Sequence, residues 1–346
     1  MRTKQTNQYE QEKQAIEHFQ AEKSLTPLDK LLKYHNIPNI KFKNADEARK
    51  LIIPNALYLQ KMNKPNLLAR GCTTPTELYS KYQNAFSDIT TQERTVVAEF
   101  ILELLDKIKP RNPAYYKYLC YWIGRISIAK AKPWLEAGMP HTLEDTIIMD
   151  AGWFNNPREN TFIHELTHVH QRIAPFEFEE LYKDLHYLEY TSNGNNIDGT
   201  NNSNIEGIRG MGAVIALNRN NPDGLSANWL WIDNNGTRWW IGAIFNNITP
   251  SSLTDVKNVA LKLEQDADGT LYYLKQNPIL LDDFTEFNTF FGNNPNNYHP
   301  NEMAAKYAEW YLEDVLGIIS GQKYNGFLGY RIYKKYMDNL MMKYYK

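Results

Sequence analysis

One motif in the sequence has residue types and spacing that could do chemistry: His164-Glu165-Leu166-Thr167-His168. Two histidines four residues apart lie one turn apart on the same face of a helix, so both imidazoles can reach one metal ion. Glu165 lies beside that face, where a carboxylate can take a proton from an attacking water and pass it to a leaving amine. The pattern predicts Zn²⁺ as cofactor, with His164 and His168 as metal ligands and Glu165 as the catalytic general base.

The residues around the motif predict a helix over 161–172 with two distinct faces. At about 100° per residue, His164 and His168 fall within roughly 40° of each other. An apolar stripe on the other side of the helix comprises Phe162, Leu166, Val169 and Ile173. We therefore expect one face in the core and the histidine pair at an open cleft. His170 points roughly 140° away from the pair, so we expect it to pack and not to bind the same ion.

A catalytic zinc needs a third protein ligand and an open position. The extended pattern HExxHxxGxxH is absent, since position 174 is Ala174. The third ligand is therefore expected further along the chain. Glu302, in the sequence NEMAA, is one candidate, and Glu189 and His186 are the alternatives. A different role for Glu302 is an ion pair on a solvated helix face, because that face also carries Lys306, Glu309 and Glu313.

HExxH followed downstream by a helical NExxA resembles the gluzincin group of zinc metallopeptidases. The first motif is also similar to bacterial metallopeptidases with the pattern HELTHVxQ, in which an apolar strand and a short loop precede the helix. The resemblance covers the two motifs and the residues next to them. It implies a zincin-like fold, Glu302 as the third zinc ligand, and a strand beside the cleft that could bind an extended substrate. Lys306 stands where thermolysin-like enzymes carry an aspartate that orients a zinc-bound histidine, so the partner of His164 is not assigned.

A peptidase also needs a hydrogen-bond donor for the developing oxyanion. Tyr298 and His299 directly precede the Glu302 helix, which is predicted to start at Pro300. Both would lie near the metal if Glu302 binds it, so either is a candidate catalytic residue. The alternative for both is a role in helix capping and packing.

The composition argues against several other classes of function. The net charge is −2, from 38 basic and 40 acidic residues, so no nucleic acid is predicted as a partner. Cys72 and Cys120 form neither a disulfide framework nor a CxxC pair. No run of 18 apolar residues could span a membrane, and the N-terminus holds no signal-peptide core. We expect a cytoplasmic protein, or one exported without a cleaved signal peptide.

The order of elements predicts an α+β fold that is mainly α. Residues 1–133 are expected to form a helical N-terminal region, and residues 134–346 a zincin-like catalytic domain. A strand over 145–154 and a hairpin over 227–245, turning at Asn234-Asn235-Gly236, predict a small antiparallel sheet. The four tryptophans of the hairpin are expected to pack across strands, and the alternative left open is that a minority of them faces a substrate: Trp229, Trp231, Trp239 and Trp240.

Several other segments carry specific expectations. Residues 1–24 are expected to form a loosely docked helix, 192–204 a loop and 283–299 a connection. Helices are predicted over 95–109, 113–133, 176–191 and 252–265, and from Pro300 onwards.

The predicted function is zinc-dependent hydrolysis of peptide bonds, with a protein or peptide as substrate. Two rivals remain open because HExxH determines the metal chemistry better than it determines the substrate. One is a zinc amidase that acts on a non-protein amide. The other is a non-catalytic binding or effector protein on a metallopeptidase-like scaffold, in which the aromatic hairpin and the helical region would carry the function.

Overall fold

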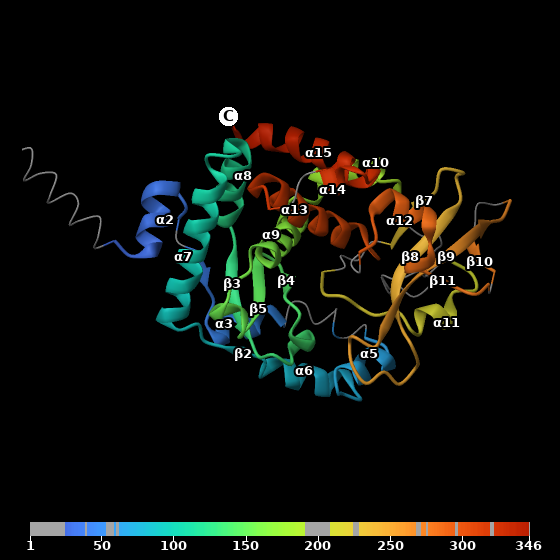
Figure 1. The fold of residues 1–346 in the computed structure, drawn as a ribbon. Coiled ribbons are helices and arrows are strands. Elements are labelled where there is room, and N and C mark those ends of the chain that lie inside the picture. Colours follow the sequence, from blue (N-terminus) through green and yellow to red (C-terminus); the bar gives the residue numbers. More distant parts are fainter. Residues whose placement is uncertain are drawn as a thin grey trace, which may run out of the picture.

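The structure is a computed structural model, which describes residues 25–38, 40–52, 59, 62–190, 208–223, 228–267, 271–274, 276–294, 297–318 and 322–345. The helix predicted over 1–24 and the loop predicted over 192–204 lie outside the described residues. The fold is α+β and mainly helical, as predicted. Its two sheets, A and B, lie in different halves of the molecule (Figure 1).

The helices of the first half begin at capped residues. In chain order they are α2 (Pro27–His35), α3 (Ala45–Ile52), α5 (Lys64–Ala69), α6 (Pro75–Gln83), α7 (Thr91–Ile108) and α8 (Pro113–Ile123). Each of three threonine side chains accepts a hydrogen bond from the backbone N–H three residues later: Thr26, Thr74 and Thr90. The acidic side chain of that later residue accepts a hydrogen bond from the backbone N–H of the threonine. These capping boxes satisfy backbone N–H groups at the starts of α2, α6 and α7.

Sheet A contains β1 (Lys41–Phe42), β2 (Phe86–Ser87), β3 (Ser127–Ala131), β4 (His141–Leu143) and β5 (Thr146–Asp150). β3 is parallel to β1 and β5, while β4 pairs antiparallel with β5 and forms one edge. The predicted boundary between residues 133 and 134 falls between β3 and β4. Both predicted regions therefore contribute strands to this sheet.

The helix predicted over 113–133 is shorter than expected. α8 ends at Ile123, with Gly124 as its C-cap, and Ser127–Ala131 forms β3 in the middle of sheet A. Every residue of β3 is buried. Because both faces of this short strand are buried, its sequence shows no alternation of apolar and polar residues that would distinguish it from the end of a buried helix.

The second half supplies the remaining helices. They are α9 (Glu159–Ile173), α10 (Glu179–Asp184), α11 (Gly212–Ile215), α12 (Thr285–Phe291), α13 (Pro300–Leu316), α14 (Gln322–Asn325) and α15 (Leu328–Tyr345), with 3-10 turns η1 (Leu135–Gly138), η2 (Trp153–Asn155), η3 (Pro175–Glu177) and η4 (Leu281–Asp283). α13 begins at Pro300, as predicted. In the part of the chain that the structure describes, no helix has the length and apolar character needed to cross a membrane.

Sheet B is antiparallel and contains β6 (Tyr187–Tyr190), β7 (Asn228–Ile232), β8 (Arg238–Phe245), β9 (Val256–Gln265), β10 (Leu271–Tyr273) and β11 (Ile279–Leu280). The predicted hairpin is β7–β8. The Asp233 carboxylate accepts hydrogen bonds from the backbone N–H groups of Asn235 and Thr237 and from Trp239 Nε1. Gly236 follows with a φ of 80°, which glycine adopts without strain. These contacts shape the turn that the Asn-Asn-Gly sequence predicts.

The helix predicted over 252–265 is wrong, because Val256–Gln265 forms β9. The Ser252 hydroxyl accepts a hydrogen bond from the backbone N–H of Thr254, which makes a tight turn and not a helix cap. The whole of β8, from Arg238 to Phe245, pairs with β9. Its buried face alternates with period two and comprises Val259, Leu261 and Leu263. Strand pairing thus outweighs a local signal that resembled a capping box.

Two shorter segments also differ from expectation. Of the helix predicted over 176–191, only Glu179–Asp184 is α-helical. His186 then takes a φ of 64° and turns the chain into β6. The predicted connection 283–299 contains α12. The aromatic side chains of this helix and of its N-cap residue contact the buried ring of Trp231 on several sides: Phe284, Phe287, Phe290 and Phe291.

Candidate metal centre

α9 carries the predicted pair of histidines with its apolar side in the core. Phe162, Leu166 and Val169 are buried, as the helical pattern predicts. Ile173, at the end of the helix, is 47% exposed, so the apolar stripe stops one turn earlier than expected. His164 lines a cavity, whereas His168 is buried beneath it.

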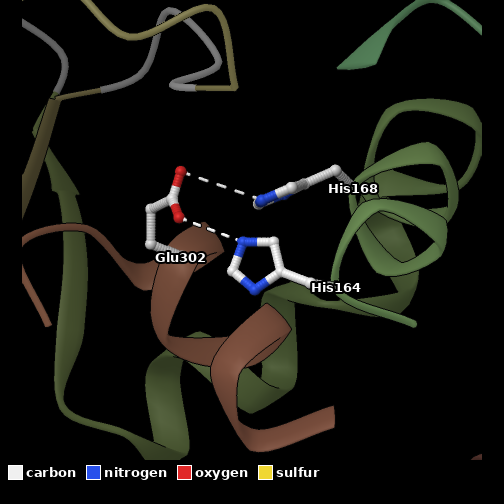
Figure 2. Close-up of side chains that lie close together, drawn as sticks. All are labelled: His164, His168 and Glu302. Atoms are coloured by element: carbon white, nitrogen blue, oxygen red, sulfur yellow. Dashed lines mark ion pairs between the residues drawn. The ribbon is translucent and has the colours of Figure 1, made fainter. Parts of the chain in front are cut away.

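α13 packs against α9 and brings Glu302 to the two histidines. Figure 2 shows the Glu302 carboxylate pointing toward both imidazole rings. Glu302 Oε2 lies 3.3 Å from His164 Nε2, and Glu302 Oε1 lies 3.8 Å from His168 Nε2. The three candidate donor atoms all lie within 4.8 Å of one another. The structure therefore brings together the three residues that the sequence predicts as metal ligands.

The other ring nitrogens have partners that fix how each histidine is protonated. His164 Nδ1 lies 2.8 Å from Glu309 Oε1, and His168 Nδ1 lies 2.7 Å from Gln171 Oε1. The Gln171 amide nitrogen donates to the backbone oxygen of Asn301, so its oxygen must face His168. Both acceptors are oxygens, so Nδ1 carries a proton in each ring. The Nε2 nitrogens are thus the ones that can face a cation.

The atoms present fit a zinc ion. Two imidazole nitrogens and one carboxylate are a donor set that catalytic zinc sites use. His168 Nε2 is buried and has no hydrogen-bond partner among the described residues. A buried polar atom without a partner costs about 1–3 kcal/mol, and coordination to a cation would remove that cost.

Electrostatics in the cluster also favour a cation. Burial opposes ionisation of Glu302, but His168 and His164 attract its charge and hold the pKa of Glu302 well below its usual value. Burial likewise disfavours a charged His164, yet Glu302 and Glu309 raise the pKa of His164 well above its usual value. Glu302 and His164 thus favour a proton between them, and a divalent cation could take the place of that proton. Metal binding at such sites releases protons.

Glu165 stands at the cavity wall beside the histidines. Its Oε2 accepts a hydrogen bond of 3.1 Å from the Thr142 hydroxyl. Burial, followed by the negative charge of Asp223, raises the pKa of Glu165 to about 7, against the attraction of His164 and His168. A carboxylate with a pKa near neutrality can both accept and return a proton.

Tyr298 and His299 lie in different environments. Tyr298 lines the cavity, and its hydroxyl accepts hydrogen bonds from Arg219 (2.9 Å) and Asn221 (2.7 Å). With both lone pairs used, the hydroxyl proton of Tyr298 is free to donate elsewhere. His299 Nδ1 accepts from the backbone N–H of Asn301 at the start of α13, and burial lowers the pKa of His299 to about 4. His299 does not line the cavity, so the structure gives it the capping role.

The alternative third ligands lie away from the cluster. Glu189 is exposed in β6, and the ring of His186 packs against Phe290 at 5.1 Å. Among the described residues, neither belongs to the group that could hold a metal ion. His170 packs in the core, as predicted, between the Tyr118 hydroxyl and Glu177.

The cluster opens into a cavity of about 690 Å³. Its walls come from sheet A, α9, α13, sheet B and the segment 218–223, which runs between the two sheets. Glu136 and His141 line the sheet A side, and Leu253 and Lys257 line the sheet B side. None of the four hairpin tryptophans lines it, and Trp231, Trp239 and Trp240 are buried, as expected for cross-strand packing.

Sequence reasoning missed the residues that support the cluster. Glu309 is the partner of His164, and Lys306 pairs with Glu309 at 2.6 Å. The spacing of the two glutamates could have indicated this role, because Glu309 lies two turns after Glu302 on the same face of the helix. In the structure both glutamates are buried, so this part of the helix face is not a solvated surface. Asn221, which donates to Glu302 Oε1 at 2.7 Å, comes from a segment with no motif. Nothing in the sequence could have placed it.

Comparisons with family models, with curated proteins and with solved structures find no match to this chain.

Proposed function

We propose that the protein is a zinc-dependent peptidase whose metal is held by His164, His168 and Glu302. One observation carries the proposal: two imidazole nitrogens and a carboxylate converge beside Glu165 at the wall of a cavity. This is a ligand set of catalytic zinc sites that leave a fourth position open for a water or substrate. The resemblance of the two motifs to gluzincins supports the same assignment.

When bound, zinc would act as a Lewis acid on the scissile carbonyl and lower the pKa of the attacking water. Glu165 would take a proton from that water and pass it to the leaving amine. Thr142 holds one oxygen of Glu165, which leaves the other oxygen for proton transfer.

Tyr298 is the candidate for stabilising the developing oxyanion. Its hydroxyl is held in the cavity wall by Arg219 and Asn221, and burial, together with the nearby charge of Glu302, raises the pKa of Tyr298. Tyr298 therefore stays protonated across the neutral range and can donate a hydrogen bond. Donors fixed before the reaction stabilise the transition state without reorganisation.

A peptide suits the shape of the site. Pockets for small ligands span about 300–1,000 Å³, and this cavity falls within that range. Edge strand β4 contributes His141 to the wall. An extended chain bound beside an edge strand can form backbone hydrogen bonds with it.

The test is peptide cleavage by the zinc-loaded, full-length protein and its Glu165→Gln variant. A library of synthetic peptides is incubated with each protein, and the products are identified by mass spectrometry. We expect E165Q to keep its zinc and to cleave about 10²–10⁴-fold more slowly, because the general base is lost.

Glu159→Gln is the matched control in the same helix. Glu159 pairs with Lys107 at 3.0 Å outside the cavity, so E159Q should cleave at the rate of the unsubstituted protein. Unchanged cleavage by E165Q, or no peptide cleaved by the zinc-loaded protein, would contradict the proposal.

A further inference from the structure

Two permanently charged cations line the cavity, Arg219 and Lys257. Lys257 is exposed in β9, whereas Arg219 is only partly exposed and its Nε is buried without a hydrogen-bond partner among the described residues. One terminal nitrogen of Arg219 donates to the Tyr298 hydroxyl at 2.9 Å, and its guanidinium carbon lies 5.3 Å from the centre of the Tyr298 ring. The guanidinium is thus held in place at the cavity wall.

Arg219 differs from the two other arginines near the site in having no acidic partner. Arg70 pairs with Glu136 at 2.7 Å, and Arg172 lies 3.6 Å from Asp223. No carboxylate lies within ion-pair distance of Arg219 in the part of the chain that the structure describes. A partly buried charge without an ion-pair partner is unfavourable, and an anion from outside the chain would remove that cost. The planar guanidinium matches the two oxygens of a carboxylate.

Arg219 lies a short distance from the metal centre. Hydrogen bonds of 2.9, 2.7 and 2.7 Å lead from Arg219 through Tyr298 and Asn221 to Glu302 Oε1. Consecutive Cα atoms of a peptide are about 3.8 Å apart, so this path spans one or two residues. An anion bound to Arg219 therefore lies one or two residues from a peptide bond at the metal centre.

We propose that Arg219 binds the free C-terminal carboxylate of a peptide substrate, so that one or two residues are removed from the C-terminus. This inference rests on the proposed peptidase function. In the reaction the peptide C–N bond breaks. Water supplies a hydroxyl to the new carboxylate of the shortened peptide and a hydrogen to the amine of the released fragment. Every peptide with a free C-terminus supplies a carboxylate one or two residues from a peptide bond near its end. An acidic side chain would supply one only in peptides with Asp or Glu at the right position.

The binding test uses full-length E165Q protein, which is expected to bind peptides without cleaving them. A synthetic peptide library is made in two forms, with a free C-terminal carboxyl and with an isotopically marked C-terminal amide, and both are passed together over immobilised protein. Charge-assisted hydrogen bonds to a guanidinium should retain the free acids about 10- to 100-fold better than the amides. Adding Arg219→Gln to E165Q should bring the ratio to near one.

Two companion variants make the binding result specific to Arg219. Lys257→Gln in the E165Q background should keep the preference for free acids, because Lys257 is an exposed cation on the same cavity. Arg219→Lys keeps the charge but loses the paired hydrogen bonds, so it should keep part of the preference. Circular dichroism and thermal unfolding show whether each variant is folded. Equal retention of free acids and amides by E165Q would overturn the inference. A preference for free acids that is lost on adding K257Q but kept on adding R219Q would also overturn it.

The cleavage test separates this inference from the proposed function. Zinc-loaded protein with Glu165 intact should remove one or two residues from the free acids and leave the amides largely uncut. Cleavage at internal bonds, equal in both libraries, would overturn the role of Arg219 and leave the peptidase standing. Cleavage that depends on Asp or Glu side chains would likewise assign Arg219 to a different carboxylate. A lack of cleavage in both libraries would count against the proposed function itself.

Discussion

The rings of His164 and His168 are held by hydrogen bonds on the side opposite the candidate metal position. Glu309 accepts from His164, and Gln171 accepts from His168. Glu309 is itself held by Lys306 at 2.6 Å, and it is mostly buried. Such partners fix the orientation of a ring and strengthen it as a ligand, so they contribute to metal affinity without touching the metal.

Glu309→Ala should weaken zinc binding. The His164 ring loses the acceptor that orients it, so we expect the zinc dissociation constant to rise about 10- to 100-fold, measured by competition with a chelator. Glu313, one turn further along α13, bonds with Asn160 and Tyr324, and E313A is the control that should bind zinc as the unsubstituted protein does. Equal zinc affinity for E309A and the unsubstituted protein would exclude this role of Glu309.

The geometry of the candidate metal centre depends on how helix α13 packs against helices α9 and α15. The Tyr307 hydroxyl of α13 is buried and donates to the backbone oxygen of Phe291 at 3.0 Å. Gly329, at the start of α15, lies against it. A Cβ at position 329 would lie 2.5 Å from that hydroxyl oxygen and 3.0 Å from a ring carbon of Phe291. Glycine therefore permits the close approach of α15.

Gly329→Ala should be destabilising, although alanine favours a helix. The added methyl collides with a fixed hydroxyl, so the free energy of unfolding should fall by about 1–3 kcal/mol in urea titrations. Gly326 has only one atom within 4 Å of its would-be Cβ, at 3.9 Å, and G326A should change stability by less than about 1 kcal/mol. A G329A protein as stable as G326A would show that the helices have room to adjust.

Elements with strong local signals could be predicted from the sequence. The Asn-Asn-Gly turn and the motif helix could both be recognised, because residues close in sequence determine them. β3 and β9 were mistaken for helix, because their strand state depends on pairing with distant strands.

The residues of the candidate site also fall into two groups, those that a local sequence pattern predicts and those that it does not. His164, Glu165 and His168 follow from one helical turn, whereas placing Glu302 from the sequence required a resemblance to a known second motif. Asn221 and Arg219 reach the site only because the segment 218–223 is held between distant elements. Their positions depend on tertiary contacts that no local pattern records.

The segment 218–223 connects the parts of the molecule that surround the cavity. Asn218 pairs with Ile244 of sheet B, and Asp223 accepts from the backbone N–H of Thr142 in sheet A. Arg70 donates to the backbone oxygen of Asn220. The buried pair of Arg70 and Glu136 thus ties the first half of the chain to the cavity wall.

Glu136→Gln should destabilise the protein in a pH-dependent way. Burial opposes ionisation of Glu136, but the charge of Arg70 lowers its pKa to about 2. Because the pKa of Glu136 is lower in the folded protein than in the unfolded chain, where it is 4.5, ionised Glu136 stabilises the fold at pH values above 4.5. This contribution is lost as the pH falls from 4.5 toward 2. E136Q removes the negative charge that compensates the buried Arg70 guanidinium, so at pH 6 the free energy of unfolding of E136Q should be about 3–5 kcal/mol lower than that of the unsubstituted protein.

Urea unfolding at several pH values tests this prediction. The difference between E136Q and the unsubstituted protein should shrink as the pH is lowered from 4.5 toward 2. Glu103, which is 70% exposed and pairs with Lys107, provides the control, and E103Q should cost less than about 1 kcal/mol at any pH. A constant difference between E136Q and the unsubstituted protein over this pH range would contradict the ionic role of Glu136.

The most direct test of the metal centre combines two measurements on the full-length protein. One is the number of zinc ions bound per chain, and the other is the X-ray absorption spectrum at the zinc edge. We predict one zinc per chain, bound at about 2.0–2.2 Å by nitrogen and oxygen only, with the signature of two imidazoles. The imidazole signature should disappear when His164 and His168 are both replaced by alanine. Sulfur ligands, zinc well below one per chain, or a spectrum unchanged in the double variant would contradict this prediction.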